Sequence, residues 1–351
     1  MDFAFTDEQA MIAETARNFF AEAATSERTR AAMAGDGLDR ATWERFCREL
    51  GLGGLAFPEA CGGSALGMVE FASVAEAAGG QVAAIPLLGH AMTGAALVAG
   101  GGPEQQAAWL ARMAAGDAIA AVAEGPVDVH GDGTLSGQLP FVPHGAVADL
   151  FLVLAPGGAW LVDAGSAGVH VRAPTTMDQT RPLANLMLDR AVAAPLADPA
   201  AAGAAARSAG CICLAAEAVG GAQACLDRTV AYARERVQFG RPIGSFQAYK
   251  HRLADMMVDI EQARSALYWA ACAVDEGSDD AALALHAAKS FCADTFFKCA
   301  GDMIQLHGGI GFTWEHDAHL FFKRARSVQT LLENGAWHRE QVAAMILGEA
   351  A

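Results

Sequence analysis

The chain has 351 residues, of which 53% are hydrophobic, and a formal net charge of −16 from 24 basic and 40 acidic side chains. A chain of this length can bury a large core and suggests roughly two or three domains. The acidic balance repels phosphate backbones, so bulk nucleic-acid binding is not expected. No apolar run of about 18 residues is free of charge, and the first residues carry neither a basic region nor an apolar signal core. We therefore expect no membrane insertion and, by default, a cytoplasmic location.

The N-terminal third is predicted to be helical. Thr6 and Gln9 form a capping-box pattern, in which a hydroxyl residue is followed three positions later by glutamine. An apolar stripe then follows at helical spacing: Ile12, Ala16, Phe19, Phe20 and Ala23. The spacing of Trp43, Phe46 and Leu50 repeats this pattern and ends at Gly51. Further helices are predicted over residues 68–78 and 103–115.

The composition changes near Gly116, and short apolar runs broken by Gly, Asp and Pro follow. These runs predict strands over residues 118–123, 133–142, 149–155, 159–162, 169–173 and 186–189. Long helices return with small-residue content that suits a four-helix bundle and a terminal helix. They are predicted over residues 200–237, 246–276, 279–306, 318–332 and 336–349. The sequence thus predicts an α+β fold with a helical domain (1–116), a shortened β domain (117–197) and a second helical domain (198–351).

Eight cysteines are spread along the chain, and two of them form a Cys-x-Cys pair. On the predicted helix, Cys211 and Cys213 would point to different faces, because residues two apart do not face each other. Most of their neighbours are small or apolar. We expect structural thiols rather than a metal or redox site.

Residues 236–247, RVQFGRPIGSFQ, combine a cation, an aromatic ring and a turn. The guanidinium of Arg236 can fork two hydrogen bonds to a pyrophosphate. Phe239 can lie against an adenine face. Gly240 and Pro242 favour a turn between two helices. For this segment alone, a helix–helix corner with a surface arginine is the alternative interpretation.

Residues 305–312, QLHGGIGF, follow a predicted helix. Gly308 and Gly309 carry no side chains, so a ligand can approach the backbone closely. A glycine helix stop is the alternative. His307, His316 and His319 are candidate metal ligands, but no cysteine lies nearby and no His-x-x-x-His pair is present. We therefore predict no metal site here.

Together with residues 229–236 and 251–256, these two segments resemble the flavin-binding signatures of the acyl-CoA dehydrogenase family. Residues 58–63, PEACGG, resemble the N-terminal domain of that family, so the resemblance covers nearly the whole chain. It implies the three-domain plan and FAD as the cofactor. It also implies contacts to the adenosine and pyrophosphate part of FAD, typically the FAD of a neighbouring subunit, from Arg236, Phe239, Gln247, Gln305, Gly308 and Gly309. The acidic charge balance disfavours the DNA-associated alkylation-response relatives.

The motifs with which this family holds the flavin ring within the same subunit are altered. Residues 121–126, AVAEGP, stand where a Thr-Glu-Pro-x-x-Gly-Ser-Asp type turn is expected. In a Lys-x-Trp-Ile-Thr type segment, Phe141 takes the tryptophan position and Pro143 the threonine position. Proline has neither an N–H nor a hydroxyl, so Pro143 has no donor for the flavin N5.

The reaction of the family needs a carboxylate over the α-carbon of the substrate. Aligning residues 322–326 without a gap places Leu332 at one family position for this base and Glu333 one residue later. A shift of one residue turns a helical side chain by about 100°. The other family position falls at about Gly210. Glu333 is therefore the candidate base, with a solvated glutamate as the alternative, and Glu217 is interpreted as a buried residue with a local partner.

The resemblance implies α,β-dehydrogenation of an acyl-CoA, with hydride transfer to flavin and electrons passed to an electron-transfer flavoprotein. The residues that would contact the FAD of a neighbouring subunit are intact, whereas those that would hold the flavin ring within the same subunit are altered. This combination is typical of one subunit of a two-gene, heteromeric enzyme for bulky CoA thioesters, sterol side chains included. Its partner in a heterotetramer would supply the flavin-ring pocket and the base. Two alternatives are a self-sufficient homo-oligomer that uses Glu333 and a non-catalytic scaffold subunit.

Overall fold

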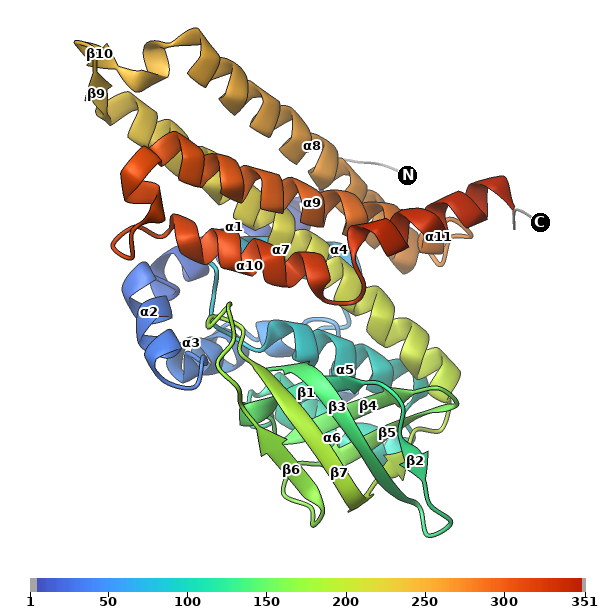
Figure 1. Cartoon of the computed structure of the whole chain (residues 1–351). Helices are drawn as coiled ribbons and strands as arrows, with labels where there is room; N and C mark the ends of the chain where they lie inside the picture. Colours follow the sequence, from blue (N-terminus) through green and yellow to red (C-terminus); the bar gives the residue numbers. More distant parts are fainter. Residues whose placement is uncertain (1–4, 349–351) are drawn as a thin grey trace. The chain divides into compact units, whose positions relative to one another are not determined.

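The computed structural model in Figure 1 describes residues 5–348. The chain divides into two compact units, which are built from interleaved segments. The helical unit comprises the chain up to Ser26, Met68–Ala83 and the chain from Cys211 onward. The mixed unit comprises Glu27–Gly67 and Ala84–Gly210. The three-domain division at residues 116/117 and 197/198 stays a prediction, because it follows sequence order rather than these units.

The helical unit is a bundle of long helices with short connections. Its elements are α1 (Asp7–Ala23), α4 (Met68–Gly80), α7 (Pro199–Glu235, in this unit from Cys211), β9 (Val237–Gln238), β10 (Arg241–Pro242), α8 (Gln247–Asp275), α9 (Ala281–His307), the 3-10 helix η6 (Gly308–Phe312), α10 (Ala318–Thr330) and α11 (Gly335–Leu347). Figure 1 shows α8 and α9 running side by side as neighbours in the bundle. Met256, Ile260 and Leu267 on α8 and Phe296 on α9 are fully buried, so apolar residues three to four apart line the core.

Glycine allows α4 and α7 to approach each other closely. A Cβ on Gly220 would lie 1.8 Å from the Glu76 carbonyl oxygen, and one on Gly79 would lie 2.3 Å from the Glu217 carbonyl oxygen. No larger residue fits at either position without moving a helix. The same helix α7 is long and apolar enough to cross a membrane, but 89% of its most apolar window is buried in the structure, as in the core helix of a globular protein.

The mixed unit contains the strands. Its helices are α2 (Ser26–Ala34, whose first residue belongs to the helical unit), α3 (Arg40–Glu44), α5 (Leu87–Gly100) and α6 (Pro103–Ala114). Its strands are β1 (Ala120–Glu124), β2 (Asp128–Val129), β3 (Thr134–Pro143), β4 (Leu150–Ala155), β5 (Gly158–Asp163), β6 (Val169–Arg172), β7 (Leu183–Val192) and β8 (Ala194–Pro195). They form two four-stranded sheets, ordered β1-β4-β5-β8 and β2-β3-β7-β6.

One apolar core joins the two sheets face to face. Alternate residues of the first sheet, such as Phe151 and Val153 on β4, share it with Leu135, Leu186 and Leu188 from the second. Alternation is what a strand with one buried face requires. β1 and β4 pair in parallel, and the other strand pairs within the two sheets are antiparallel.

The predicted α+β architecture is confirmed, with helices on either side of a central β region in the sequence. The capping box is also confirmed, since Thr6 Oγ1 accepts from the Gln9 amide at 3.2 Å and the Thr6 amide donates to Gln9 Oε1 at 3.0 Å. All eight cysteines are free thiols. Burial raises the pKa of Cys47, Cys292 and Cys299 to about 12, which keeps them as unreactive thiols.

Candidate functional site

A two-stranded hairpin follows α7 and carries the first group of predicted contact residues. β9 and β10 pair in register Arg241↔Gln238, so Phe239 and Gly240 form the turn between them. Both turn residues have positive φ angles, 54° and 77° respectively. This is the backbone that two-residue hairpin turns need, and glycine at the second position adopts it without strain. The turn leaves the Phe239 ring 92% exposed.

Arg236 lies at the base of this hairpin. Its amide donates to the Tyr232 carbonyl at 2.9 Å, and its carbonyl accepts from the Ile243 amide at 2.8 Å. The backbone is therefore fixed on both sides while the side chain is exposed. Gln247, also exposed, begins α8 directly after Phe246, whose ring lies 4.0 Å beneath the Arg241 guanidinium.

The second group lies where α9 ends. Gln305, Gly308 and Gly309 are exposed, and Gly308 has φ 65° and ψ −141°, a conformation that only glycine adopts readily. A Cβ at Gly308 or at Gly309 would meet nothing within 4 Å. The two glycines thus leave open space beside the backbone, where a ligand can approach it.

One hydrogen bond ties the two groups together. The Tyr249 hydroxyl on α8 donates to the Leu306 carbonyl on α9 at 3.0 Å. Figure 1 shows the β9–β10 hairpin and the end of α9 at the same end of the bundle. We call Arg236, Phe239, Gln247, Gln305, Gly308 and Gly309 the dinucleotide cluster. Tyr249 was missed from the sequence, because its partner Leu306 lies 57 positions away and no local pattern marks the contact.

Large apolar side chains that lie near the dinucleotide cluster in the sequence are exposed. Phe312 is 85% exposed and Trp314 is 62% exposed; Val237 and Ile310 are also exposed. Exposed apolar groups gathered at one end of a protein mark a surface that a ligand or another chain covers. This end of the helical unit therefore has the character of an interface as well as a cofactor site.

His307 has a structural role. Its Nδ1 donates to the Met303 carbonyl at 2.7 Å, and its ring stacks on Tyr232 at 4.5 Å between centroids. Burial lowers the pKa of His307, so the ring is held in its neutral form. Within residues 5–348, no three His, Cys, Asp or Glu side chains are grouped as a metal site would require.

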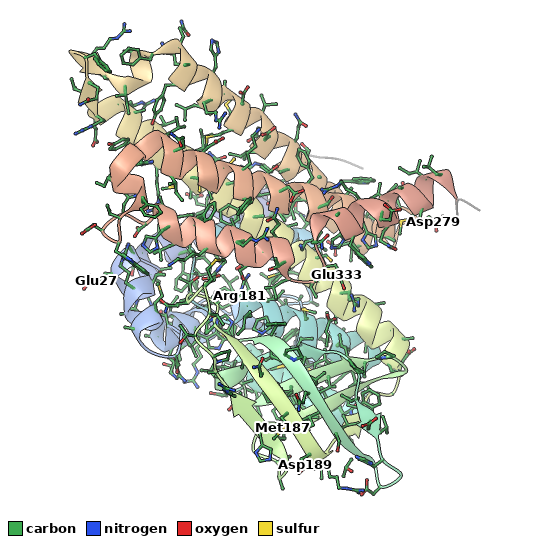
Figure 2. The ribbon with its side chains drawn as sticks, viewed as in Figure 1. Glu27, Arg181, Met187, Asp189, Asp279 and Glu333 are labelled. Carbon is green, nitrogen blue, oxygen red and sulfur yellow. The ribbon has the colours of Figure 1, made fainter. Side chains whose placement is uncertain are left out.

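Glu333 and the dinucleotide cluster lie at opposite ends of helix α10. Figure 2 labels it on the loop between α10 and α11. α10 begins shortly after η6 and has 13 residues. The helix therefore separates the two places by about 20 Å at 1.5 Å per residue. Glu333 is exposed, and no hydrogen bond or ion pair of its carboxylate is found within the described part of the chain.

The loop that carries Glu333 has an unusual backbone. Leu332 and Glu333 both have positive φ angles, 51° and 71°. Their carbonyls are held by buried donors, because His338 Nε2 lies 2.8 Å from the Leu332 oxygen and Lys289 Nζ lies 3.4 Å from the Glu333 oxygen. Lys289 also donates to the Val328 carbonyl at 3.0 Å. Non-glycine residues keep such a conformation only where the surroundings enforce it, and it is frequent at functional sites.

Glu217 has the local partner expected from the sequence. Its Oε1 accepts from Arg324 Nη1 at 3.3 Å, and both side chains are buried. Arg324 Nη2 also donates to the Ala83 carbonyl at 3.3 Å. The pair joins α7 to α10 inside the helical unit and leaves Glu217 with a structural role.

The segment aligned with the flavin-ring motif is irregular in the mixed unit. The β3–β7 register shifts between Leu139 and Val142, and Phe141 bulges out with φ 62° and 68% exposure. Pro143 pairs with Leu183 at the end of β3. A bulge re-aims side chains near a site, and here it turns an aromatic ring outward while proline supplies no donor.

Two family models match the chain. The model of the acyl-CoA dehydrogenase N-terminal domain matches residues 6–117, and that of the C-terminal domain matches residues 205–347. The strands of the mixed unit lie between the two matched ranges.

Similar proteins come from sequence and from structure. The chain is 38% identical over 330 residues to the acyl-CoA dehydrogenase IpdE2 of Mycobacterium tuberculosis, covering 93% of this chain and 94% of that protein. It superposes on one chain of the ChsE4–ChsE5 complex of Mycobacterium tuberculosis with a TM-score of 0.92 and 30% identity, and the match covers 100% of this chain and 100% of that chain. For a chain of the G363A variant of the Tcur3481–Tcur3483 steroid ACAD, the TM-score is 0.88 at 30% identity. The match covers 97% of this chain and 98% of that chain.

Proposed function

Because the chain belongs to the acyl-CoA dehydrogenase family of FAD-dependent oxidoreductases, we propose that it is one subunit of a heteromeric acyl-CoA dehydrogenase. The assembly dehydrogenates a bulky CoA thioester between its α and β carbons. One observation carries the heteromeric assignment: the dinucleotide cluster is gathered and exposed at one end of the helical unit, whereas Pro143 leaves the flavin-ring segment without its hydrogen-bond donor. Two similar solved structures, Tcur3481–Tcur3483 and the ChsE4–ChsE5 complex, are each named for two proteins, which supports a second subunit.

The dinucleotide cluster fits the adenosine and pyrophosphate part of FAD. The open space beside Gly308 and Gly309 lets the backbone approach the ligand, and the exposed Arg236 guanidinium can pair with phosphate oxygens. The exposed Phe239 ring offers a face for the adenine. FAD supplies the redox chemistry of the reaction. The residues of this chain bind and orient it, and the exposed aromatic rings beside them keep water out when the partner covers them.

The general base is proposed to come from the partner subunit. A base for proton removal from carbon works best with a pKa raised toward the operating pH, usually by burial. Glu333 is exposed rather than buried in the described part of the chain. The electron acceptor proposed for the assembly is an electron-transfer flavoprotein, and the substrate class is a steroid-derived or other bulky CoA thioester. The name of one structural neighbour as a steroid ACAD supports this class.

A homo-oligomer that uses Glu333 is the second candidate, and one observation favours it. The two positive φ angles at Leu332 and Glu333 are enforced by Lys289 and His338, as is frequent in functional loops. A scaffold subunit without a catalytic role would need neither this loop nor the dinucleotide cluster.

Separate and joint expression distinguishes these functions. Expressed alone, the chain should be poorly soluble or poor in flavin, and co-expression with the partner chain should give a yellow, active complex. Activity and full flavin content in the chain alone would support the homo-oligomer. A complex whose flavin content and activity survive the Arg236→Ala and Gly308→Val changes would support the scaffold.

A further inference from the structure

The end of helix α9 is held by a side chain of the neighbouring helix α8 (Figure 1). The last carbonyl groups of an α-helix have no amide donor within the helix and need other partners. The Gln305 carbonyl accepts from the Gly308 amide, where the chain turns out of α9. The Leu306 carbonyl accepts from the Tyr249 hydroxyl of α8 at 3.0 Å. The backbone directly before the Gly308–Gly309 turn is therefore tied to α8.

Tyr249 has the position and the protonation state that this hold requires. It is half-buried and lies two residues after Gln247, which begins α8. Burial raises the pKa of its hydroxyl to about 12, so the group remains a donor at neutral pH. One turn further along α8, Arg252 Nη2 lies 2.7 Å from Oδ1 of the buried Asp302 on α9. Residues three or four apart share a helix face, so both links join the same faces of α8 and α9.

A second tyrosine, Tyr232 on α7, contacts the same end of α9. Its ring stacks on His307 at 4.5 Å between centroids, and its carbonyl accepts from the Arg236 amide at 2.9 Å. The His307 ring is tied to its own helix by the hydrogen bond to the Met303 carbonyl at 2.7 Å. Tyr232 thus connects the end of α9 to the base of the β9–β10 hairpin, as Tyr249 connects it to the start of α8.

We propose that Tyr249 is a positioning residue for FAD, which fixes the Gly308–Gly309 turn relative to α8 before the cofactor binds. The inference rests on the proposed function of the dinucleotide cluster. Tyr249 acts through the backbone rather than by touching FAD, because its hydroxyl already donates to the Leu306 carbonyl. A site whose parts are held in place before binding avoids the cost of ordering them when the ligand arrives. Loss of this hydroxyl therefore weakens the binding of FAD.

Tyr249→Phe removes only the hydroxyl, and the chain offers a matched control. Tyr268 also lies on α8, donates its hydroxyl to Glu76 Oε2 at 3.0 Å, and has its pKa raised to about 12 by burial. Each change to phenylalanine thus removes one hydrogen bond of the same kind and length. In the enzyme assembled with its partner, Tyr249→Phe should weaken the Kd of FAD by about two- to twelvefold. Tyr268→Phe should leave this Kd unchanged.

The two halves of FAD separate a positioning role from a general loss of stability. The dinucleotide cluster is proposed to contact the adenosine and pyrophosphate, so ADP is the probe for this half and FMN is the probe for the other. Both are titrated as competitors of FAD in the apo complex. In Tyr249→Phe, ADP should lose affinity by the same factor as FAD, and FMN should bind as it does to the wild type. Equal losses for ADP and FMN would overturn the proposal.

A double variant shows whether Tyr249 acts through the glycine turn. A Cβ at Gly309 would meet no protein atom within 4 Å, so Gly309→Ala intrudes only on the space left for the ligand. Once this methyl group keeps FAD from the backbone, adding Tyr249→Phe should cost little further affinity. Fully additive losses would overturn the proposal.

Arg236→Ala, measured in parallel, separates this inference from the proposed function. An unchanged FAD Kd in Tyr249→Phe together with a weakened one in Arg236→Ala would overturn the positioning role alone. An unchanged Kd in both variants would overturn the proposed dinucleotide site and the positioning role with it.

Discussion

Replacing Arg236 with alanine tests the dinucleotide cluster without disturbing the fold. The Arg236 side chain is exposed and makes no hydrogen bond or ion pair within residues 5–348, so its removal breaks no contact inside the chain. The hydrogen bond from the Ile243 amide goes to the backbone carbonyl of Arg236 and survives the change. Any loss must therefore come from a ligand. A hydrogen bond to a charged group is worth about 1.5–3 kcal/mol, which corresponds to roughly 10- to 150-fold weaker binding of FAD.

The assay is flavin retention by the assembled enzyme. Wild-type and Arg236→Ala complexes are passed through gel filtration, and the flavin absorbance per protein is measured; titration of the apo complex with FAD gives the Kd. Arg234→Ala is the matched control, because Arg234 is an exposed arginine in the last turn of α7, which ends directly before Arg236. We expect FAD loss in Arg236→Ala alone. Equal FAD occupancy and Kd in the two variants would refute the assignment of Arg236 to the pyrophosphate.

Three further changes probe the base, the core and the pH dependence. Glu333→Gln should leave the rate of substrate-induced flavin bleaching unchanged, because the base is proposed to lie in the partner; a loss of at least about 10²-fold with FAD still bound would make Glu333 the base. Arg324→Met should lower the free energy of unfolding by about 3–5 kcal/mol, since it removes the guanidinium that pairs with the buried Glu217 carboxylate. Arg324→Met with Glu217→Leu should recover most of the loss in urea denaturation. His90 is buried and its Nε2 donates to the Gly53 carbonyl; burial lowers its pKa from 6.5 to about 4. The free energy of unfolding should fall as the pH drops from 6.5, the ordinary pKa of histidine, to about 4, the pKa of His90 in the folded protein. The loss should be about 3 kcal/mol in total, because the unfolded state takes up the proton first. His90→Gln should lack this part of the pH dependence, and a parallel loss in both proteins would contradict the assignment.

The helices and strands with clear periodicity could be predicted from the sequence. The predicted helix over 279–306 is observed as α9, Ala281–His307, and the strand over 149–155 is observed as β4, Leu150–Ala155. α5, Leu87–Gly100, was missed, because it is apolar on nearly all sides and therefore shows no amphipathic period. The short strands β2 and β8 were missed because two residues carry no alternation.

Helix ends depended on contacts that the sequence does not display. The predicted helix over 318–332 ends at Thr330, because Leu332 and Glu333 take positive φ angles. Hydrogen bonds from Lys289 and His338 to their carbonyl oxygens stabilise this conformation. Those two donors lie on α9 and α11, so no local sequence pattern predicts where the helix ends. The predicted last helix is observed to Leu347, and its final predicted residue lies outside the described part of the chain.

The candidate site was predictable where residues are close in the sequence and unpredictable where they meet through folding. The glycine pair and the arginine-to-phenylalanine spacing pointed to residues that the structure gathers at one end of the helical unit, and their contact with FAD stays a prediction. The link from Tyr249 to Leu306 joins residues 57 positions apart, and the bulge at Phe141 depends on pairing with β7.

The most direct test of the heteromeric assignment is native mass spectrometry with flavin quantification on the product of co-expression. The account predicts a heterotetramer with a pair of each chain, FAD bound, and turnover of an acyl-CoA only when both chains are present. A stable homotetramer of this chain that carries one FAD per subunit and oxidises acyl-CoA unaided would contradict it.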